Sequence, residues 1–345
     1  IINGAMQVAQ RGTSVTIANT GAYSSPDRFR VQHNANTTST LTQVSDAPSN
    51  FKYSLKFTNG AGETRDGADY ARLYTRLEGY DVNHLKLGTS SAKGFTLQFW
   101  VKSSLTGTFG VGFTGNDNGS NGVYSSSYTI SSANTWEYKT YTVTDGMTTF
   151  DTDSNDNGIG FGVHFDLGEG PSRSSSEGPH PTTNSGSMGL TDGIKILATS
   201  GATWQVTGVQ LEVGKVATPF EHRSYGEELA ACQRYYERLV QGGDGYNAIC
   251  VSVGLGSQYA YGVLDFKTTK RAAPTMSYDG DFRLLGAPNI LGITTLGEFY
   301  NPQINKVRMR SDTGGTNLTN SNAYVLEFSG ANSNSGGYIA ADAEL

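Results

Sequence analysis

Hydrophobic and polar residues alternate with a period of two over much of the first 213 residues. Phe95, Leu97, Phe99 and Val101, for example, are separated by Thr, Gln and Trp. Successive side chains of a β-strand point to opposite faces, so this period predicts strands that are buried on one face. The pattern recurs, with Gly, Asn, Asp and Ser between the runs, at residues 53–57, 109–113, 136–143, 161–167 and 204–213. Many short strands with turn-rich connections favour an all-β protein that begins with a jelly-roll sandwich.

A pattern typical of a helix covers residues 218–239, TPFEHRSYGEELAACQRYYERL. Ser224 and Glu227 have the spacing of a capping box, in which each side chain bonds a backbone amide of the first turn. Apolar residues then recur at spacings of three and four: Leu229, Cys232, Tyr236 and Leu239. We predict a helix of about four turns, whose apolar stripe forms an interface with a β domain or with a neighbouring subunit.

Strand-like runs return after the paired glycines at positions 242 and 243. They lie at residues 246–266, 282–300, 303–312 and 323–345 and are interrupted by Gly, Asn and Pro. They predict a second, smaller β sandwich. The expected organisation is therefore a jelly roll over residues 1–221, a linker helix over 222–241 and a C-terminal β domain over 242–345.

Composition and charge exclude several classes of function. Charged residues make up 16% of the 345 residues and the net charge is −6, so no basic field is available to hold a nucleic acid. The two cysteines, Cys232 and Cys250, offer neither a disulfide framework nor zinc spacing. No apolar run is long enough to span a bilayer, and we expect no membrane insertion. The sequence leaves open whether an anchoring segment precedes Ile1.

Sugar binding requires flat aromatic faces and hydrogen-bonding side chains on one surface. Strand parity places several such residues opposite the predicted core positions, and we predict that they form one ligand-binding face: Trp100, Tyr141, His164, Asp166 and Gln210. The alternative is that this face is covered by the chain itself or meets a neighbouring subunit, since exposed aromatic residues also mark interfaces.

The segment DTDSNDNG, residues 151–158, carries hard oxygen ligands mostly at alternate positions, as a calcium loop does. The candidate ligands are Asp151, Asp153, Asn155 and Asp156. The segment departs from an EF-hand, because position six is Asp156, position twelve is Gly162 and no helices flank it. A plain polar turn is the competing interpretation. No other cofactor is expected.

Several longer motifs resemble virion structural proteins of tailed bacteriophages, including marine ones, which are described as tail fibres or head-decorating proteins. The resemblance covers almost the whole chain and rests on these segments: IINGAMQVAQRG, FTLQFWVKSSLTGTFGVGF, TISSANTWEYKTYTV, WQVTGVQLEVGKVATPFEHRSYGEELAACQRYYER, KRAAPTMS and ADAEL. It implies a jelly roll similar to carbohydrate-binding modules, followed by a C-terminal β domain. It also implies a location on the particle surface, with other virion proteins as partners and a homo-oligomer, for which a trimer is favoured.

The expected function is therefore passive: adhesion to a host glycan, or reinforcement of the particle. The alternative is a virion depolymerase that cleaves polysaccharide, which would need two carboxylates about 5–10 Å apart across a cleft. Asp166 and Glu212 are the first candidates for such a pair, with Glu137 and Glu169 as others. No spacing singles out a pair, so we expect a protein without enzymatic activity.

Overall fold

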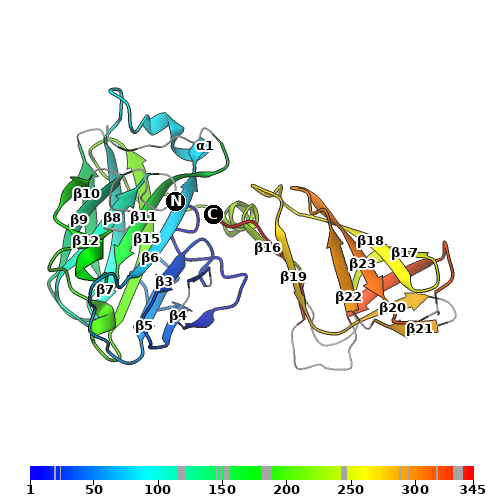
Figure 1. Cartoon of the computed structure of the whole chain (residues 1–345). Helices are drawn as coiled ribbons and strands as arrows, with labels where there is room; N and C mark the ends of the chain where they lie inside the picture. The colour runs from blue at the N-terminus through cyan, green and yellow to red at the C-terminus, as the bar shows by residue number, and fades with distance from the viewer. Residues whose placement is uncertain are drawn as a thin grey trace. The chain divides into compact units, whose positions relative to one another are not determined.

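The chain folds into two compact β units, seen in the computed structural model of Figure 1. The N-terminal unit comprises Ile1–Leu229 with Leu345, and the C-terminal unit comprises Ala230–Glu344. The structure describes residues 1–18, 21–23, 25–115, 122–144, 147, 150, 156–180, 188–241, 247–286, 289–293, 295–315, 318–328 and 337–345.

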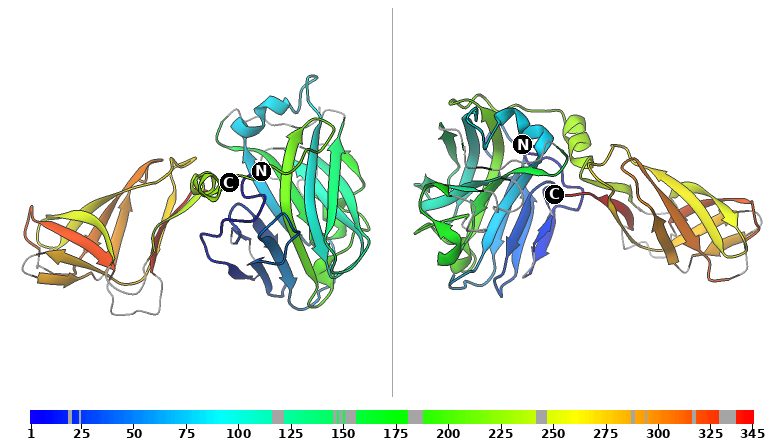
Figure 2. Two further views of the ribbon diagram at one scale, coloured as in Figure 1. Left: turned by 180° about the vertical axis from the view of Figure 1, so that it is seen from behind. Right: turned by 45° about the horizontal axis from the view of Figure 1, so that its top comes forward.

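The N-terminal unit is a sandwich of two antiparallel sheets (Figure 2). The six-stranded sheet has the order β1 (Ser14–Ile17), β4 (Ser39–Val44), β5 (Ser54–Asn59), β15 (Thr203–Val213), β7 (Phe95–Ser103) and β10 (Glu137–Val143). The seven-stranded sheet has the order β13 (Gly178–His180), β9 (Val123–Ile130), β8 (Gly107–Thr114), β11 (Ile159–Asp166), β6 (Ala71–Glu78), β3 (Arg30–His33) and β2 (Ala22–Tyr23). Short elements complete the unit: α1 (Gly79–Val82), the 3₁₀ turns η1 (Asn83–Leu85), η3 (Pro171–Arg173) and η4 (Ile196–Ala198), and the parallel pair β12 (Ser174–Ser175) and β14 (Gly189–Leu190).

The core of this unit confirms the predicted alternation. All four apolar residues of β7 named above are fully buried, as are Phe161, Val163 and Phe165 on β11. Aromatic rings join the two sheets edge to face: Phe99 lies 5.1 Å from Phe165 between ring centroids, and Phe95 lies 5.5 Å from Phe161. Such contacts stabilise the sandwich beyond the burial of apolar area. The all-β fold and the jelly-roll sandwich predicted from the sequence are both confirmed.

The predicted helix is present but shorter than expected. The capping box forms, since Ser224 N donates to Glu227 Oε2 over 2.9 Å and Glu227 N donates to Ser224 Oγ over 3.3 Å. However, α2 spans Tyr225–Gln233, and β16 (Tyr236–Gln241) follows it. Strand pairing with β25 (Tyr338–Asp342), in which Tyr236 lies opposite Asp342, overrides the helical spacing. No helix in the described part of the chain has the length and apolar character that a membrane span requires.

The predicted interface stripe is therefore not a helical stripe. Leu229 and Cys232 belong to α2, whereas Tyr236 and Leu239 belong to β16. Cys232 and Tyr236 are buried within the chain, and Leu239 packs against the core of the C-terminal unit. Three of the four residues therefore pack within the chain, which fits the predicted contact with a β domain, and an interface with a neighbouring subunit stays a prediction.

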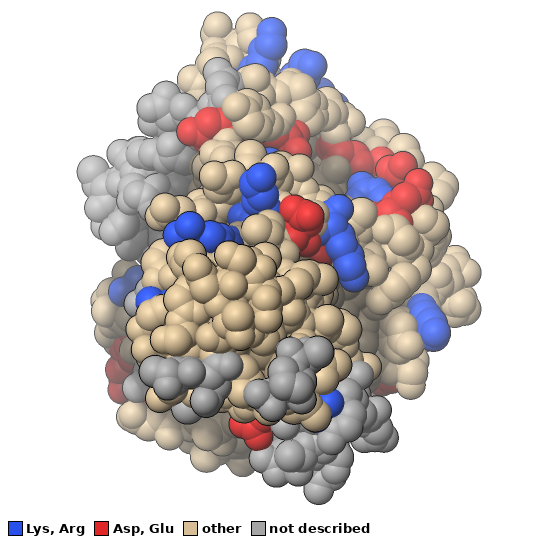
Figure 3. Space-filling view, turned by 90° about the vertical axis from the view of Figure 1, so that its right-hand side faces the viewer, with Lys and Arg blue, Asp and Glu red and all other residues tan. Residues whose placement is uncertain are grey.

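The C-terminal unit contains a small sheet and a large sheet, which confirms the predicted second β sandwich. The small sheet has the order β16, β25 and β19 (Thr275–Asp279). The large sheet has the order β21 (Asn289–Gly292), β20 (Phe282–Gly286), β24 (Ala323–Phe328), β17 (Ala248–Leu255), β18 (Tyr259–Asp265), β23 (Lys306–Asp312) and β22 (Thr295–Tyr300). Leu284, Leu326 and Ile339 are fully buried in its core. Figure 3 looks onto this unit and shows a broad area without charged side chains, next to which Lys and Arg residues stand.

An ion pair is fully buried in the C-terminal unit. Lys270 Nζ donates to Glu237 Oε2 and to the carbonyl oxygen of Gln233, each over 2.5 Å. Neither charged side chain is exposed. Burial lowers the pKa of Lys270, and Glu237 opposes that shift. The pair joins β16, the first strand of this unit, to the segment before β19. It therefore holds the beginning of the unit against the rest of it.

Replacement of Glu237 by Gln should selectively destabilise the C-terminal unit by about 3 kcal/mol, because Lys270 would keep its burial and lose its counter-charge. Denaturant unfolding of the full chain checks this. Trp100, Trp136 and Trp204 all lie in the N-terminal unit, so their fluorescence transition should not move, while a circular dichroism transition should shift. Asp265→Asn, at an exposed position of β18, is the matched control. Equal stability of the two variants would contradict the prediction.

Candidate glycan-binding groove

The outer face of the six-stranded sheet carries a groove with a volume of about 660 Å³. Strands β7, β10 and β15 form its floor, and the segments before β5 and after β15 form one wall. Its lining residues are Asn50, Phe51, Gln98, Trp100, Tyr138, Gly208, Pro219, Phe220 and His222. None of them is Asp, Glu, Lys or Arg, so this is an uncharged and largely aromatic surface.

Two groups of aromatic rings face the groove. Trp100 on β7 and Tyr138 on β10 are direct cross-strand partners, and their ring centroids lie 5.4 Å apart. Phe51, Phe220 and His222 form the second group, with centroids 4.9 to 5.2 Å apart. Rings on adjacent strands that share a face stand side by side. The groove therefore offers aromatic surfaces from two directions.

Gln98 supplies amide chemistry between the two aromatic groups. Its Oε1 accepts a hydrogen bond from Tyr138 Oη, and its Nε2 donates to the carbonyl oxygen of Thr218 over 2.8 Å. These bonds fix both the amide and the tyrosine ring. The indole N–H of Trp100 has no hydrogen-bond partner among the residues that the structure describes, which leaves it available to a ligand.

The wall formed by residues 214–222 is held by side chains of β15. Glu212 Oε2 accepts a bond from Thr218 N over 3.0 Å, and Gln210 Oε1 accepts one from Glu221 N over 2.8 Å. The bonds from Thr218 lower the pKa of Glu212 although burial opposes the shift. Both side chains therefore position the loop that presents Phe220 and His222.

The structure brings together only some of the predicted ligand residues. Trp100 lines the groove and Gln210 lies beside it, on the same sheet, bonded to the loop wall. The prediction that Tyr141 lies on the ligand-binding face was wrong. Tyr141 is the cross-strand partner of Leu97 and packs against the core, and its hydroxyl lies 3.2 Å from that of Tyr124. On β10 it is Tyr138 that shares the outer face with Trp100. Because β10 is an edge strand with aromatic residues of both parities, its period did not reveal which face is buried.

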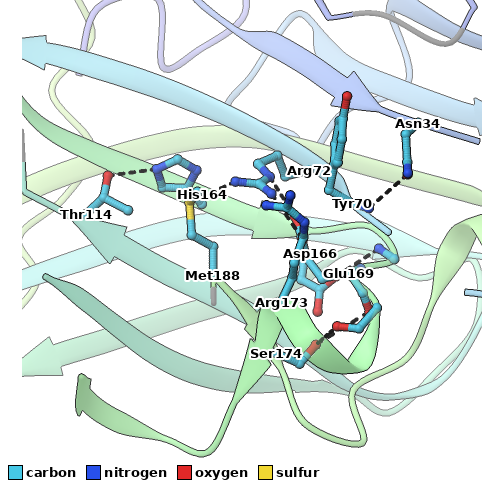
Figure 4. A network of polar contacts seen from close by, with 12 residues as sticks. Asn34, Tyr70, Arg72, Thr114, His164, Asp166, Glu169, Arg173, Ser174 and Met188 are labelled. Atoms are coloured by element: carbon cyan, nitrogen blue, oxygen red, sulfur yellow. Dashed lines mark hydrogen bonds and ion pairs between the residues drawn. The ribbon is translucent and has the colours of Figure 1, made fainter. Parts of the chain in front are cut away.

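The prediction that His164 and Asp166 belong to the ligand-binding face was also wrong. Both lie on the seven-stranded sheet and are only 2% exposed. His164 Nε2 lies 2.9 Å from Thr114 Oγ1 (Figure 4). Burial, together with Arg72 and Arg76, lowers the pKa of His164 well below its usual value. Asp166 accepts bonds from the amides of Gly168 and Glu169, both over 2.8 Å.

A buried ion pair lies beside them in Figure 4. Arg72 Nε is 2.6 Å from Glu169 Oε1, and Arg72 Nη2 donates to Glu169 Oε2 over 3.1 Å. Asp166 Oδ2 likewise accepts bonds from Leu190 N and Lys195 Nζ, over 3.0 and 3.1 Å. The network fastens the segments that follow β11 onto the sheet face. Most of its polar groups are bonded to one another and covered, so the network has a structural role, although His164 Nδ1 is buried without a hydrogen-bond partner among the described residues.

Sequence reasoning missed most of the groove. Phe51, Tyr138, Phe220 and His222 were not predicted as ligand residues. Phe220 and His222 belong to the motif TPFEH, which was included in the segment predicted to be helical. The cross-strand pairing of Tyr138 with Trp100 depends on the register of β10 and β7, which the sequence does not specify.

The calcium prediction falls mostly outside the described residues. Asp151, Asp153 and Asn155 are not described. Asp156 is, and its Oδ1 accepts a bond from Gly158 N over 2.7 Å, as in a turn. Within the described ranges, no group of three or more His, Cys, Asp or Glu side chains is arranged to hold a metal ion.

Comparisons with known proteins give weak structural likenesses. No protein-family model matches the chain, and no curated protein sequence matches it. The enzymatically active domain of tailspike protein 4 from bacteriophage CBA120 is 13% identical, with a TM-score of 0.31 over 62% of this chain and 21% of that domain.

Two carbohydrate-binding modules give similar values. A family 4 module is 14% identical, with a TM-score of 0.30 over 61% of this chain and 98% of the module. A family 11 module from Clostridium thermocellum, in complex with a β-1,3-1,4-mixed-linked tetrasaccharide, is 11% identical, with a TM-score of 0.29 over 60% of this chain and 98% of the module.

Gly208→Ala should damage the groove wall. Gly208 has φ +64°, and a Cβ there would lie 2.7 Å from the ring of Phe51. The left-handed backbone alone should cost roughly 1–2 kcal/mol, and displacement of Phe51 should add to that. Gly201→Ala is the matched control, because Gly201 has φ +67° with nothing within 4 Å of its Cβ. Denaturation followed by tryptophan fluorescence should show the larger loss for Gly208→Ala, and equal losses would contradict this.

The buried Glu169 should make stability depend on pH. Burial raises its pKa from 4.5 to about 7, against the opposing effect of Arg72. Between these values the unfolded chain releases the proton that the folded chain keeps, so rising pH removes stability. Relative to Glu169→Gln, the wild-type chain should lose free energy of unfolding from pH 4.5 to 7, as fluorescence-monitored denaturation would measure. A gain over that range would instead mean that Arg72 keeps the folded carboxylate ionised.

Proposed function

We propose that this chain is a surface protein of a phage virion that binds uncharged host glycans through the groove on its six-stranded sheet. The observation that carries the proposal is the uncharged groove lined by Trp100, Tyr138, Phe51 and Phe220. A tail fibre and a capsid fibre or decoration both fit this role.

The chemistry of the groove suits a sugar. Pyranose rings present flat C–H patches that pack on aromatic faces, and hydroxyl groups that exchange hydrogen bonds with amides and an indole N–H. Trp100 and Gln98 offer these groups within one groove. A lining without formal charge favours neutral sugar units, because a charged unit would lose hydration without gaining a counter-charge.

The virion location rests on the resemblance of the long motifs to phage structural proteins. A particle carries many copies of its surface proteins, so weak binding by each copy would sum to strong attachment. A homo-oligomer, with a trimer as the favoured form, would present several grooves together. Reinforcement of the particle without glycan binding is the second candidate, supported by the same resemblance.

Binding without cleavage is the expected outcome of this groove. A glycosidase needs two carboxylates across one cleft, and none of the described residues that line the groove is Asp or Glu. The carboxylates first considered, Asp166 and Glu212, stand on different sheets. A depolymerase would therefore need a site elsewhere in the chain.

Trp100→Ala should lower the affinity for a bound neutral glycan at least about tenfold, which corresponds to roughly 1.4 kcal/mol, since the ring supplies much of the contact surface. A glycan array identifies the ligand and titration calorimetry measures the loss. Tyr80→Ala is the control, because Tyr80 is 63% exposed outside the groove.

Equal binding by Trp100→Ala and wild type would refute the groove as the site. The absence of binding to any neutral glycan or host cell would favour the reinforcing role. Shortening of host polysaccharide on incubation would instead establish the depolymerase.

A further inference from the structure

The C-terminal unit has a second hollow of different chemistry. It has a volume of about 260 Å³ and lies where β22 turns into β23, on the outer face of the large sheet. Its lining residues are Val263, Tyr300, Asn301, Gln303, Lys306 and Arg308. Its described lining contains two cations, whereas that of the groove in the N-terminal unit contains neither Lys nor Arg, and no carboxylate is among the described residues of either lining.

Arg308 is held in place by aromatic rings. Its guanidinium lies 4.8 Å from the ring centroid of Tyr300 and 5.5 Å from that of Tyr261. Tyrosine rings attract a guanidinium through their faces and leave its N–H edge open. No hydrogen bond or ion pair within the described part of the chain uses that edge. The structure thus presents an exposed, oriented guanidinium whose donors are available.

Lys306 stands two residues before Arg308 on β23 and shares its face. Its ammonium also has no ion-pair partner among the described residues. Asp265 is its cross-strand neighbour on β18, and Asp312 lies at the other end of β23 near Arg310. Among the described side chains on this part of the face, three cations and two carboxylates leave a net local charge of about one positive unit.

Uncharged polar groups border the two cations. Asn301 and Gln303 bring amides from the turn between β22 and β23, and Val263 brings an apolar surface opposite Arg308 in the register. An anion alone would be satisfied by the cations. The amides and the apolar surface can contact the ligand only if the anion is part of a larger molecule, and the amides would then bond its hydroxyl groups.

We propose that this pocket binds a sugar unit that carries a carboxylate, as in a uronic acid. The carboxylate bonds the edge of Arg308 through both oxygens and is attracted by Lys306, since a guanidinium matches a planar carboxylate. The sugar hydroxyls bond Asn301 and Gln303. One net positive charge suits a monoanion better than a doubly charged phosphate. This site is independent of the neutral groove and gives the chain a second specificity.

The test is calorimetric titration of the full-length chain with a galacturonic acid trisaccharide and with the corresponding neutral galactose trisaccharide. The acidic ligand should bind, and Arg308→Gln and Lys306→Gln should each weaken its binding about tenfold or more. Lys93→Gln, which makes the same change of charge at an exposed position of the N-terminal unit, should leave it unchanged. Thermal unfolding checks that each variant remains folded.

Further arms separate this site from the groove and from a simple anion site. Trp100→Ala should leave binding of the acidic trisaccharide intact, whatever it does to neutral glycans. Unchanged acidic binding in both Arg308→Gln and Lys306→Gln would overturn the proposal. So would displacement of the trisaccharide by an equal concentration of inorganic phosphate, because the pocket would then recognise charge without the sugar.

Discussion

The aromatic core between the two sheets of the N-terminal unit constrains everything on its surface. Phe95, Phe99, Phe161 and Phe165 interlock edge to face, and each pins the parity of its own strand. Once Phe99 points inward, Trp100 must point outward. The groove follows from this packing of the core. On the six-stranded sheet, the polar and aromatic residues that alternate with the core residues point to the outer face.

The same constraint explains what could be predicted from the sequence. Strands such as β7 and β11 have large apolar residues at every second position, so the buried face follows from that local alternation. Trp100 could therefore be placed on an outer face. Which sheet each strand joins depends on long-range pairing, and this is why His164 and Asp166 were assigned to the wrong surface. Asp166 is paired there with Lys195, which lies beside η4. Burial and the β6 cations Arg72 and Arg76, in contrast, disfavour the charged form of His164.

The shortened helix has a similar cause. The spacing of Leu229, Cys232, Tyr236 and Leu239 satisfies a helix, but β25 pairs with Tyr236 and its neighbours as a strand, with one register shift after Arg238. The local capping signal at Ser224 was read correctly, because a capping box involves residues three apart. The end of the helix was predicted wrongly, because it depends on pairing with a strand about a hundred residues further along the chain.

That long-range pairing also bears on how the protein is made. Strand β25 lies in the middle of the small sheet, between β16 and β19, although it is the last of these strands to be synthesised. The small sheet cannot close on the ribosome until residues 338–342 have emerged. Until then β16 and β19 present unpaired strand edges. A nascent or prematurely terminated chain would therefore carry a complete jelly roll and an incomplete C-terminal unit that is prone to aggregate.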